Sequence, residues 1–233
     1  MPAPQNGPTP APTTASPAAG AARRPRKDAL RNRAAVFAAA DALFAERPDP
    51  EDVTMAEIAA AAGVGKGTLF RAFGDRTGLL QALYRARLEP LRTAVAEGPP
   101  PLGPGAPARL RVPALLDALL CFKLDNRHLA LALERTGSPS GPYANEQYGD
   151  WHALLSGLLL EAAEGGEEAA VEDGSGLVVA VERAGFTAHA LLAAVRADLV
   201  GHLAAEGHSP VELRSRLAEF TATVLGGPRP RGA

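Results

Sequence analysis

The chain of 233 residues is about one and a half times the usual size of a single domain, which favours two modest domains or one elongated domain. Apolar residues make up 46% of the chain and charged residues 21%, a composition that can bury a core. A single cysteine, Cys121, excludes both an internal disulfide framework and a zinc site built from cysteines. No apolar run reaches the roughly eighteen residues of a membrane span, so we expect a cytoplasmic protein with no membrane partner.

The net charge of −2 is unevenly distributed along the chain. Residues 23–92 hold 13 Lys or Arg and 9 Asp or Glu, whereas residues 93–233 hold 11 and 17. A basic front and an acidic rear predict different partners for the two parts of the chain.

The composition favours helices throughout. Alanine is abundant and aromatic residues are only 5%, which suits close-packed helices better than strands. Residues 1–27 are predicted to be a disordered Pro- and Ala-rich tail that ends in a basic arm. This arm either solubilises the chain or contacts a DNA minor groove. From Asp28 the pattern is that of an amphipathic helix, whose apolar face holds Val36, Phe37, Ala40, Leu43 and Phe44.

The segment from Val53 to Tyr84 predicts two short helices followed by the start of a third. Thr54 followed by Glu57 is the pattern of a capping box at a helix start. Gly63 ends this first helix, and a second helix begins near Lys66. Asp75 is the predicted N-cap of the third helix, whose buried stripe is Leu79, Leu80, Leu83, Tyr84 and Leu88. Two helices joined by a tight glycine turn form a helix-turn-helix, in which the second helix is free to enter a DNA major groove.

Three stretches of this region together resemble the DNA-binding domain of TetR-type transcriptional regulators. They are LFAE at 43–46, VTMAEIAAAAGVGKGTLFRAFGDR at 53–76, and the LL..LY stripe at 79–84. The resemblance covers about sixty residues, 30–88, and is far more specific as a combination than any one element is alone. It implies a homodimer with a three-helix DNA-binding domain, an α-helical body for ligand binding and dimerisation, and a palindromic DNA operator. It also implies repression that a small molecule relieves.

The resemblance also implies individual contacts to DNA. Thr54 corresponds to a position that touches phosphate, although capping alone also explains it. Arg71 corresponds to an outward position, from which it could bond guanine, and Arg76 stands where the family usually has a lysine that binds phosphate. Both arginines could instead be solvated surface charges. The DNA-binding residues implied in this way are Thr54, Lys66, Gly67, Thr68, Phe70, Arg71 and Arg76.

Two positions depart from the family pattern. Phe70 replaces a common tyrosine, and this removes a hydroxyl able to bind phosphate. Gly65 replaces a frequent serine, and this removes a cap or a phosphate donor. Both departures put single contacts in doubt and leave the helix-turn-helix prediction intact.

The domain boundaries follow from composition. We predict a helix-turn-helix domain at 28–92, a Pro- and Gly-rich linker at 93–108, a helical domain at 109–226 and a flexible tail at 227–233. Within the rear domain, leucine- and alanine-rich runs predict helices at 113–134, 143–164, 186–205 and 210–225. The fold class is therefore predicted to be all-α.

Two further sites are predicted in the rear domain. The last two predicted helices have more apolar surface than one small body needs, which favours pairing with a second copy into a four-helix bundle. The residues predicted at this dimer interface are Leu192, Val195, Leu199, Leu217 and Phe220. A mostly apolar effector is predicted to bind between the helices at 113–134 and 143–164, with Trp151 as its anchor. The residues predicted to bind it are Leu119, Phe122, Arg127, Trp151 and Leu155, any of which could instead be core residues.

The sequence offers little support for catalysis. Gly63–Thr68 resembles a phosphate-binding loop, but glycine follows Lys66 where that loop needs Ser or Thr. The histidines form no metal-binding motif, and we expect no cofactor, no metal and no catalytic residue. A different class of function, an α-helical small-molecule binder or enzyme that merely retains a helix-turn-helix, stays open.

Overall fold

The structure is a computed structural model that describes residues 23–47, 52–136, 146–164 and 174–226. Every regular element of these segments is a helix, so the predicted all-α fold is confirmed. The helices are α2 (Arg23–Glu46), α3 (Met55–Ala61), α4 (Lys66–Phe73), α5 (Arg76–Glu97), α6 (Ala108–Asp125), α7 (Arg127–Thr136), α8 (Glu146–Glu164), α9 (Gly174–Ala194), α10 (Ala197–Ala205) and α11 (Pro210–Val224).

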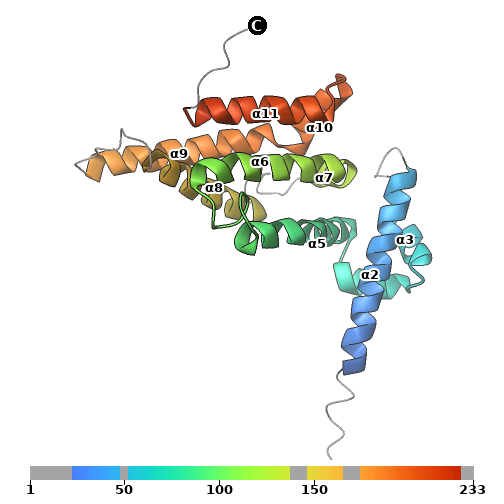
Figure 1. Cartoon of the computed structure of the whole chain (residues 1–233). Helices are drawn as coiled ribbons and strands as arrows, with labels where there is room; N and C mark the ends of the chain where they lie inside the picture. Colours follow the sequence, from blue (N-terminus) through green and yellow to red (C-terminus); the bar gives the residue numbers. More distant parts are fainter. Residues whose placement is uncertain (1–22, 48–51, 137–145, 165–173, 227–233) are drawn as a thin grey trace, which may run out of the picture.

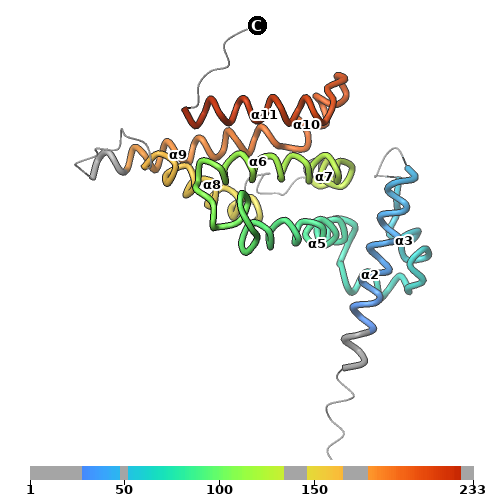
Figure 2. Tube along the Cα trace, in the orientation of Figure 1, coloured from blue at the N-terminus to red at the C-terminus, as the bar shows by residue number. Residues whose placement is uncertain are grey.

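The helices fall into two groups that α5 connects. Figure 1 shows α2 and α3 at one end of the molecule and the helices from α6 to α11 stacked at the other. We call α2, α3 and α4 the head, and α6 to α11 the body. The first turns of α5 pack on the head and its remainder packs on α6 and α7 of the body. The trace in Figure 2 makes the same connection visible.

The core of the head contains residues that the apolar periodicity of the sequence predicted to be buried. Val36, Ala40 and Phe44 line one face of α2 and pack with the buried residues of the next three helices. The rings of Phe37 and Phe73 lie 5.9 Å apart. The residues supplied by the other elements are Val53, Met55, Ile58, Ala59, Leu69, Leu79, Leu80 and Leu83.

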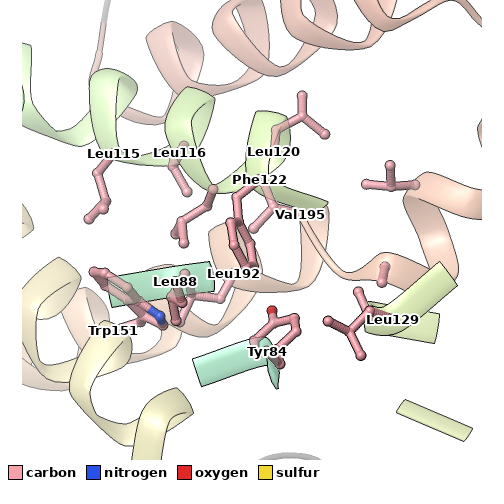
Figure 3. Close-up of a cluster of buried hydrophobic side chains, with 14 of the residues drawn as sticks. Tyr84, Leu88, Leu115, Leu116, Leu120, Phe122, Leu129, Trp151, Leu192 and Val195 are labelled. Atoms are coloured by element: carbon pink, nitrogen blue, oxygen red, sulfur yellow. The ribbon is translucent and has the colours of Figure 1, made fainter. Parts of the chain in front are cut away.

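The core of the body forms where α5, α6, α7, α8 and α9 meet, and Figure 3 shows part of it. The rings of Tyr84 and Phe122 pack edge to face, with their centroids 5.1 Å apart, and so join α5 to α6. Each fully buried leucine there contributes roughly 1.5–3 kcal/mol relative to an exposed one. The buried side chains drawn together in Figure 3 are Tyr84, Leu88, Leu115, Leu116, Leu120, Phe122, Leu129, Trp151, Leu192 and Val195.

The last helix is fixed to α6 by polar contacts as well as by packing. Arg214 donates two hydrogen bonds of 2.7 Å to the carboxylate of Asp117, a paired geometry that is stronger than a single contact. The Arg109 guanidinium donates to the carbonyl of Leu225 at 3.0 Å. The helix α11 therefore covers α6 within one chain.

Several observed boundaries differ from the predicted ones. The backbone of residues 23–27 forms the first turns of α2, whereas an arm ending at Lys27 was expected. The helix α5 continues through Pro90 to Glu97, so the loop before α6 is residues 98–107, shorter than the predicted linker at 93–108. Residues 1–22 and 227–233, predicted as tails, lie outside the described residues.

Two predicted helices are each divided in the structure. The run at 113–134 breaks at Asn126, whose amide donates to the carbonyl of Phe122 at 2.9 Å and so competes with the helical ladder. The run at 186–205 begins earlier, as α9, and breaks before α10. Arg196 has an extended backbone at that break and pairs with Asp198.

No single helix among the described residues is long and apolar enough to cross a bilayer. A pair formed by Val178–Ala194 and Ala197–Ala205 meets the length and composition criteria together, with a bend of 41° between its halves.

Candidate DNA-binding surface

The start of α3 is held by a complete capping box. The Thr54 hydroxyl accepts a hydrogen bond from the Glu57 backbone N–H at 3.3 Å, and the Glu57 carboxylate accepts one from the Thr54 backbone N–H at 2.9 Å. The same carboxylate accepts from the Thr54 hydroxyl at 2.7 Å and from Arg47 at 2.6 Å. The predicted cap is therefore confirmed, and the hydroxyl proton of Thr54 is used within the chain.

These contacts also determine the ionisation of Glu57. The hydrogen bonds from Thr54, followed by the one from Arg47, lower the pKa of Glu57 from 4.5 to about 2. A depressed folded-state pKa stabilises the folded head fully above the unfolded value of 4.5. This contribution is lost as the pH falls from 4.5 toward 2.

The turn between α3 and α4 depends on one glycine. Gly63 has a φ of +65°, which lies in the left-handed region that side chains with a Cβ rarely adopt. Val64, the next residue, is half-buried against the head core. The turn thus holds α4 at a fixed angle to α3, with Leu69 directed into the core.

The opposite face of α4 is exposed. At 3.6 residues per turn, Gly67 and Arg71 lie one turn apart and opposite the buried Leu69. Lys66 and Thr68 are exposed at the first turn of the helix. Phe70 is 47% exposed and lies beside this face.

The fold of the head does not require a glycine at position 67. A Cβ built at this position would meet nothing within 4 Å, so the packing of the head does not demand a glycine. Glycine inside a helix costs about 1 kcal/mol relative to alanine. A residue that weakens an exposed helix and leaves its surface bare is suited to the close approach of another molecule.

Arg76 has a structural contact in the free chain. Its Nε donates to the carbonyl of Val53 at 3.3 Å, which ties the start of α5 to the residue that precedes the capping box. Of the seven residues predicted to bind DNA, five are exposed on α4: Lys66, Gly67, Thr68, Phe70 and Arg71. Thr54 and Arg76 lie at the starts of the flanking helices α3 and α5.

The sequence of the head matches a known family. Residues 36–83 match the bacterial regulatory proteins of the tetR family. The HTH-type transcriptional repressor LfrR of Mycolicibacterium smegmatis is 38% identical over 82 residues, which are 35% of this chain and 42% of that protein. Over this segment the chain is similar to the TetR family.

The fold of most of the chain resembles those of solved structures. A proposed fatty acid metabolism regulator of Clostridium perfringens superposes with a TM-score of 0.54 at 16% identity, over 84% of this chain and 100% of that one. A proposed TetR-family transcriptional regulator of a Rhodococcus species superposes with a TM-score of 0.54 at 22% identity, over 84% and 99%. These likenesses concern the fold alone. The sequence match with LfrR spans less than half of that repressor.

Arg87 connects the TetR-type head to the body. This residue of α5 pairs with Asp41 of α2 through one guanidinium nitrogen. Through another nitrogen it donates to the side-chain carbonyl of Asn126 at 2.6 Å, at the junction of α6 and α7. One half-buried side chain thus bonds both groups of helices, and a shift of either group changes its contacts.

The residues predicted to bind an effector are not gathered at one cavity. Leu119, Phe122 and Leu155 are packed in the body core, because α6 and α8 lie directly against each other. Arg127 is exposed at the start of α7. Trp151 lines a groove between α5 and α8, and the lining of that groove includes none of the other four residues.

The five residues predicted at the dimer interface also differ in their burial. Leu192 on α9, Leu217 on α11 and Val195 in the turn after α9 are buried inside the single chain, as part of its own core. These three side chains are therefore unavailable to a partner. Leu199 on α10 and Phe220 on α11 are 39% and 43% exposed and stay available.

The polar residues that join the helices of this chain could not be recognised from the sequence. Arg87 bonds Asn126, and Arg92 pairs with Asp150 at 3.0 Å. Each looks like an ordinary solvated residue on a helix, and no local pattern relates partners so far apart in the sequence.

Proposed function

We propose that the chain is a sequence-specific DNA-binding transcriptional regulator, and that it represses its target until a small molecule releases it from its operator. The observation that carries this proposal is the exposed face of α4, with bare backbone at Gly67 and Arg71 one turn further along. The family of the head and the repressor named among its relatives support it. The chain acts by binding alone, in the cytoplasm, without a cofactor.

The exposed face of α4 suits the two kinds of contact that DNA recognition needs. Arg71 projects far enough to donate two hydrogen bonds to guanine in the major groove, which reads sequence. Lys66 and Thr68, at the start of the helix, and Arg76, at the start of α5, are placed for phosphates, which fix the position of the protein on the duplex. Bare backbone at Gly67 lets the helix approach the duplex closely.

A gel shift with the DNA that flanks the chain's own gene tests this function. We expect one specific complex on a palindromic site and an affinity that falls steeply as salt is raised, because bound phosphates release counterions. Scrambled DNA of the same composition is the control. Equal affinity for the two DNAs at every salt concentration would contradict sequence-specific regulation and favour a small-molecule binder that retains the motif.

We further propose that the chain binds DNA as a homodimer formed by the outward faces of its last helices. Leu199 and Phe220 are exposed apolar side chains of the two helices predicted to pair, and Phe186 adds an exposed ring on α9. Apolar surface of this kind is costly in water unless a partner covers it. A two-fold dimer would place its two recognition helices about 34–36 Å apart, one turn of DNA.

Light scattering at micromolar concentration tests the dimer. The expected mass is twice the 24.0 kDa of one chain. The double variant Leu199→Glu, Phe220→Glu should have the mass of a monomer, because two charges would be desolvated at the interface. The control Leu30→Glu, on the exposed surface of the head, should remain dimeric. A monomeric wild-type chain, or a dimeric double variant, would contradict this interface.

A further inference from the structure

Three aromatic side chains form a stack between α8 and α9, two helices that lie side by side in Figure 1. Tyr148 and His152 are four residues apart on α8 and therefore lie on the same face of that helix. His189 reaches them from α9. Between centroids, its ring lies 3.9 Å from the ring of His152 and 5.7 Å from that of Tyr148, with planes inclined by 29° and 12°. We call these three residues the aromatic stack.

Hydrogen bonds join the aromatic stack across the two helices. The Tyr148 hydroxyl lies 2.6 Å from Nδ1 of His189. Nε2 of His152 donates to the backbone carbonyl of Gly185 at 3.0 Å, and this bond fixes a hydrogen on that nitrogen because a carbonyl can only accept. Each imidazole thus bonds the opposite helix while it stacks on the other imidazole.

The aromatic stack tolerates one extra proton better than two. With both imidazoles neutral, the Tyr148 hydroxyl donates to Nδ1 of His189. If His189 takes a proton, its Nδ1 donates to the phenol oxygen instead, and the bond is kept. A second proton, on His152, places two positive rings with their centroids 3.9 Å apart, and like charges at this separation repel.

The titration of His189 agrees with this geometry. Partial desolvation, followed by the charge of His152, lowers the pKa of His189 below its usual 6.5. A histidine whose folded-state pKa is lowered stabilises the folded state fully above 6.5, and this contribution decreases as the pH falls below 6.5. His189 is exposed and His152 half-buried, so solvent screens the repulsion and keeps it modest.

No acidic side chain offsets the charge of the two imidazoles. Within the part of the chain that the structure describes, neither imidazole makes a hydrogen bond or ion pair to a carboxylate. Asp150 of α8 pairs instead with Arg92 of α5. The charge that acts on His189 is that of His152. The other charged residues of the adjoining turns, and of α6 and α10 that pack on these helices, include Glu146, Glu182, Arg183, Asp117, which Arg214 bonds, and Asp198, which Arg196 bonds.

We propose that the aromatic stack is a proton-sensitive contact, which holds α8 and α9 together near neutral pH and loosens in mild acid when its second imidazole is protonated. Two imidazoles stacked across a helix pair, each hydrogen-bonded to the opposite helix, carry this inference. Histidine changes its charge in this pH range, so the contact responds to acid that leaves most carboxylates ionised. The inference goes beyond the proposed function and does not depend on it.

A loosened stack acts next to the proposed dimer surface. His152 bonds the carbonyl of Gly185, and the next residue is Phe186, whose exposed ring belongs to that surface. A movement of α9 relative to α8 displaces this ring. We therefore expect the dimer to be weaker in mild acid. This consequence, unlike the contact itself, rests on the proposed homodimer.

An NMR titration of the imidazole protons of the full chain tests the coupling between the two histidines. His152→Gln removes the neighbouring charge and keeps a polar side chain, so the titration midpoint of His189 should rise. The matched control is His128→Gln, which removes an exposed imidazole of α7 outside the stack and should leave that midpoint unchanged. A midpoint of His189 that is the same in the wild type and in His152→Gln, or that moves equally in both variants, overturns the inference.

Native-state hydrogen exchange on the amides of α8 and α9 tests the loosening. From about pH 7.5 to about pH 5.5, protection in the wild type should fall roughly twofold to fivefold after correction for the exchange of unprotected amides. His189→Gln should largely abolish this fall, whereas His128→Gln should keep it. His152→Gln should behave as His189→Gln does, and it replaces that variant if circular dichroism shows a loss of helices. Constant protection in the wild type, or the same fall in every variant, overturns the inference.

The consequence for the dimer and the proposed function fail separately from the contact. Light scattering at the same two pH values compares the wild type with His189→Gln. Stronger dissociation of the wild type in acid supports the consequence, and equal behaviour of the two proteins overturns it alone. Neither the titration nor the exchange involves DNA. Failure to bind an operator would thus overturn the proposed function and leave the contact standing, and a failed exchange test would do the reverse.

Discussion

Replacing Arg71 with alanine should weaken operator binding by roughly 1–3 kcal/mol and relax the base preference at one position of each half-site. The reason is the exposed position of Arg71 on α4, opposite the buried Leu69. Its guanidinium makes no hydrogen bond or ion pair to any other residue that the structure describes, so its removal leaves no partner unsatisfied. The thermal stability of the free chain should therefore stay unchanged.

Fluorescence anisotropy with the operator and with single-base variants measures this effect. The control is Arg85→Ala, which removes the same charge from an exposed position on another helix, α5. Arg85→Ala should leave base preference intact. If Arg71→Ala retains both the affinity and the base preference of the wild type, the proposed role of α4 in reading DNA is wrong.

Sequence alone predicts the features of this chain that depend on residues close together in the sequence. A capping box needs only residues three apart, and Thr54 with Glu57 form one as expected. A left-handed turn needs a glycine at one position, and Gly63 supplies it. The buried stripe of α5 follows from helical spacing, because residues three and four apart share a face.

Sequence alone could not predict which other helices pack against each apolar helix face. The spacing of Leu192, Val195 and Leu217 shows that each lies on an apolar face, but it cannot distinguish a partner chain from the chain's own helices. The structure distinguishes the two cases, because these residues are buried among the helices of the same chain. The same ambiguity explains why Leu119 and Leu155 prove to be core residues.

Polar contacts between distant helices are the least predictable from sequence. Arg87 and Asn126 are 39 residues apart, and nothing in the local sequence of either indicates the other. The position of such pairs is fixed only once the helices are packed. They are also the contacts through which α5 joins the head to the body, so the link between the two candidate sites becomes visible only in three dimensions.

Two neighbouring residues of α4 should differ in how strongly the same truncation destabilises the head. Leu69 is 1% exposed, so Leu69→Ala leaves a cavity in the head core and should destabilise the head by about 2–5 kcal/mol. A helix of eight residues has little stability of its own and depends on such packing. Phe70 is a surface ring, and Phe70→Ala should cost about 1 kcal/mol or less.

Native-state hydrogen exchange on the amides of α3 and α4 separates the two variants. Leu69→Ala should reduce the protection of both helices and weaken DNA binding because the head opens. Phe70→Ala should keep the protection and still weaken DNA binding, since its ring lies beside the face that meets the duplex. Equal protection in the two variants would contradict the assignment of Leu69 to the core. Wild-type DNA affinity in Phe70→Ala would remove that ring from the DNA-binding surface and leave Lys66, Gly67, Thr68 and Arg71 as its proposed members on α4.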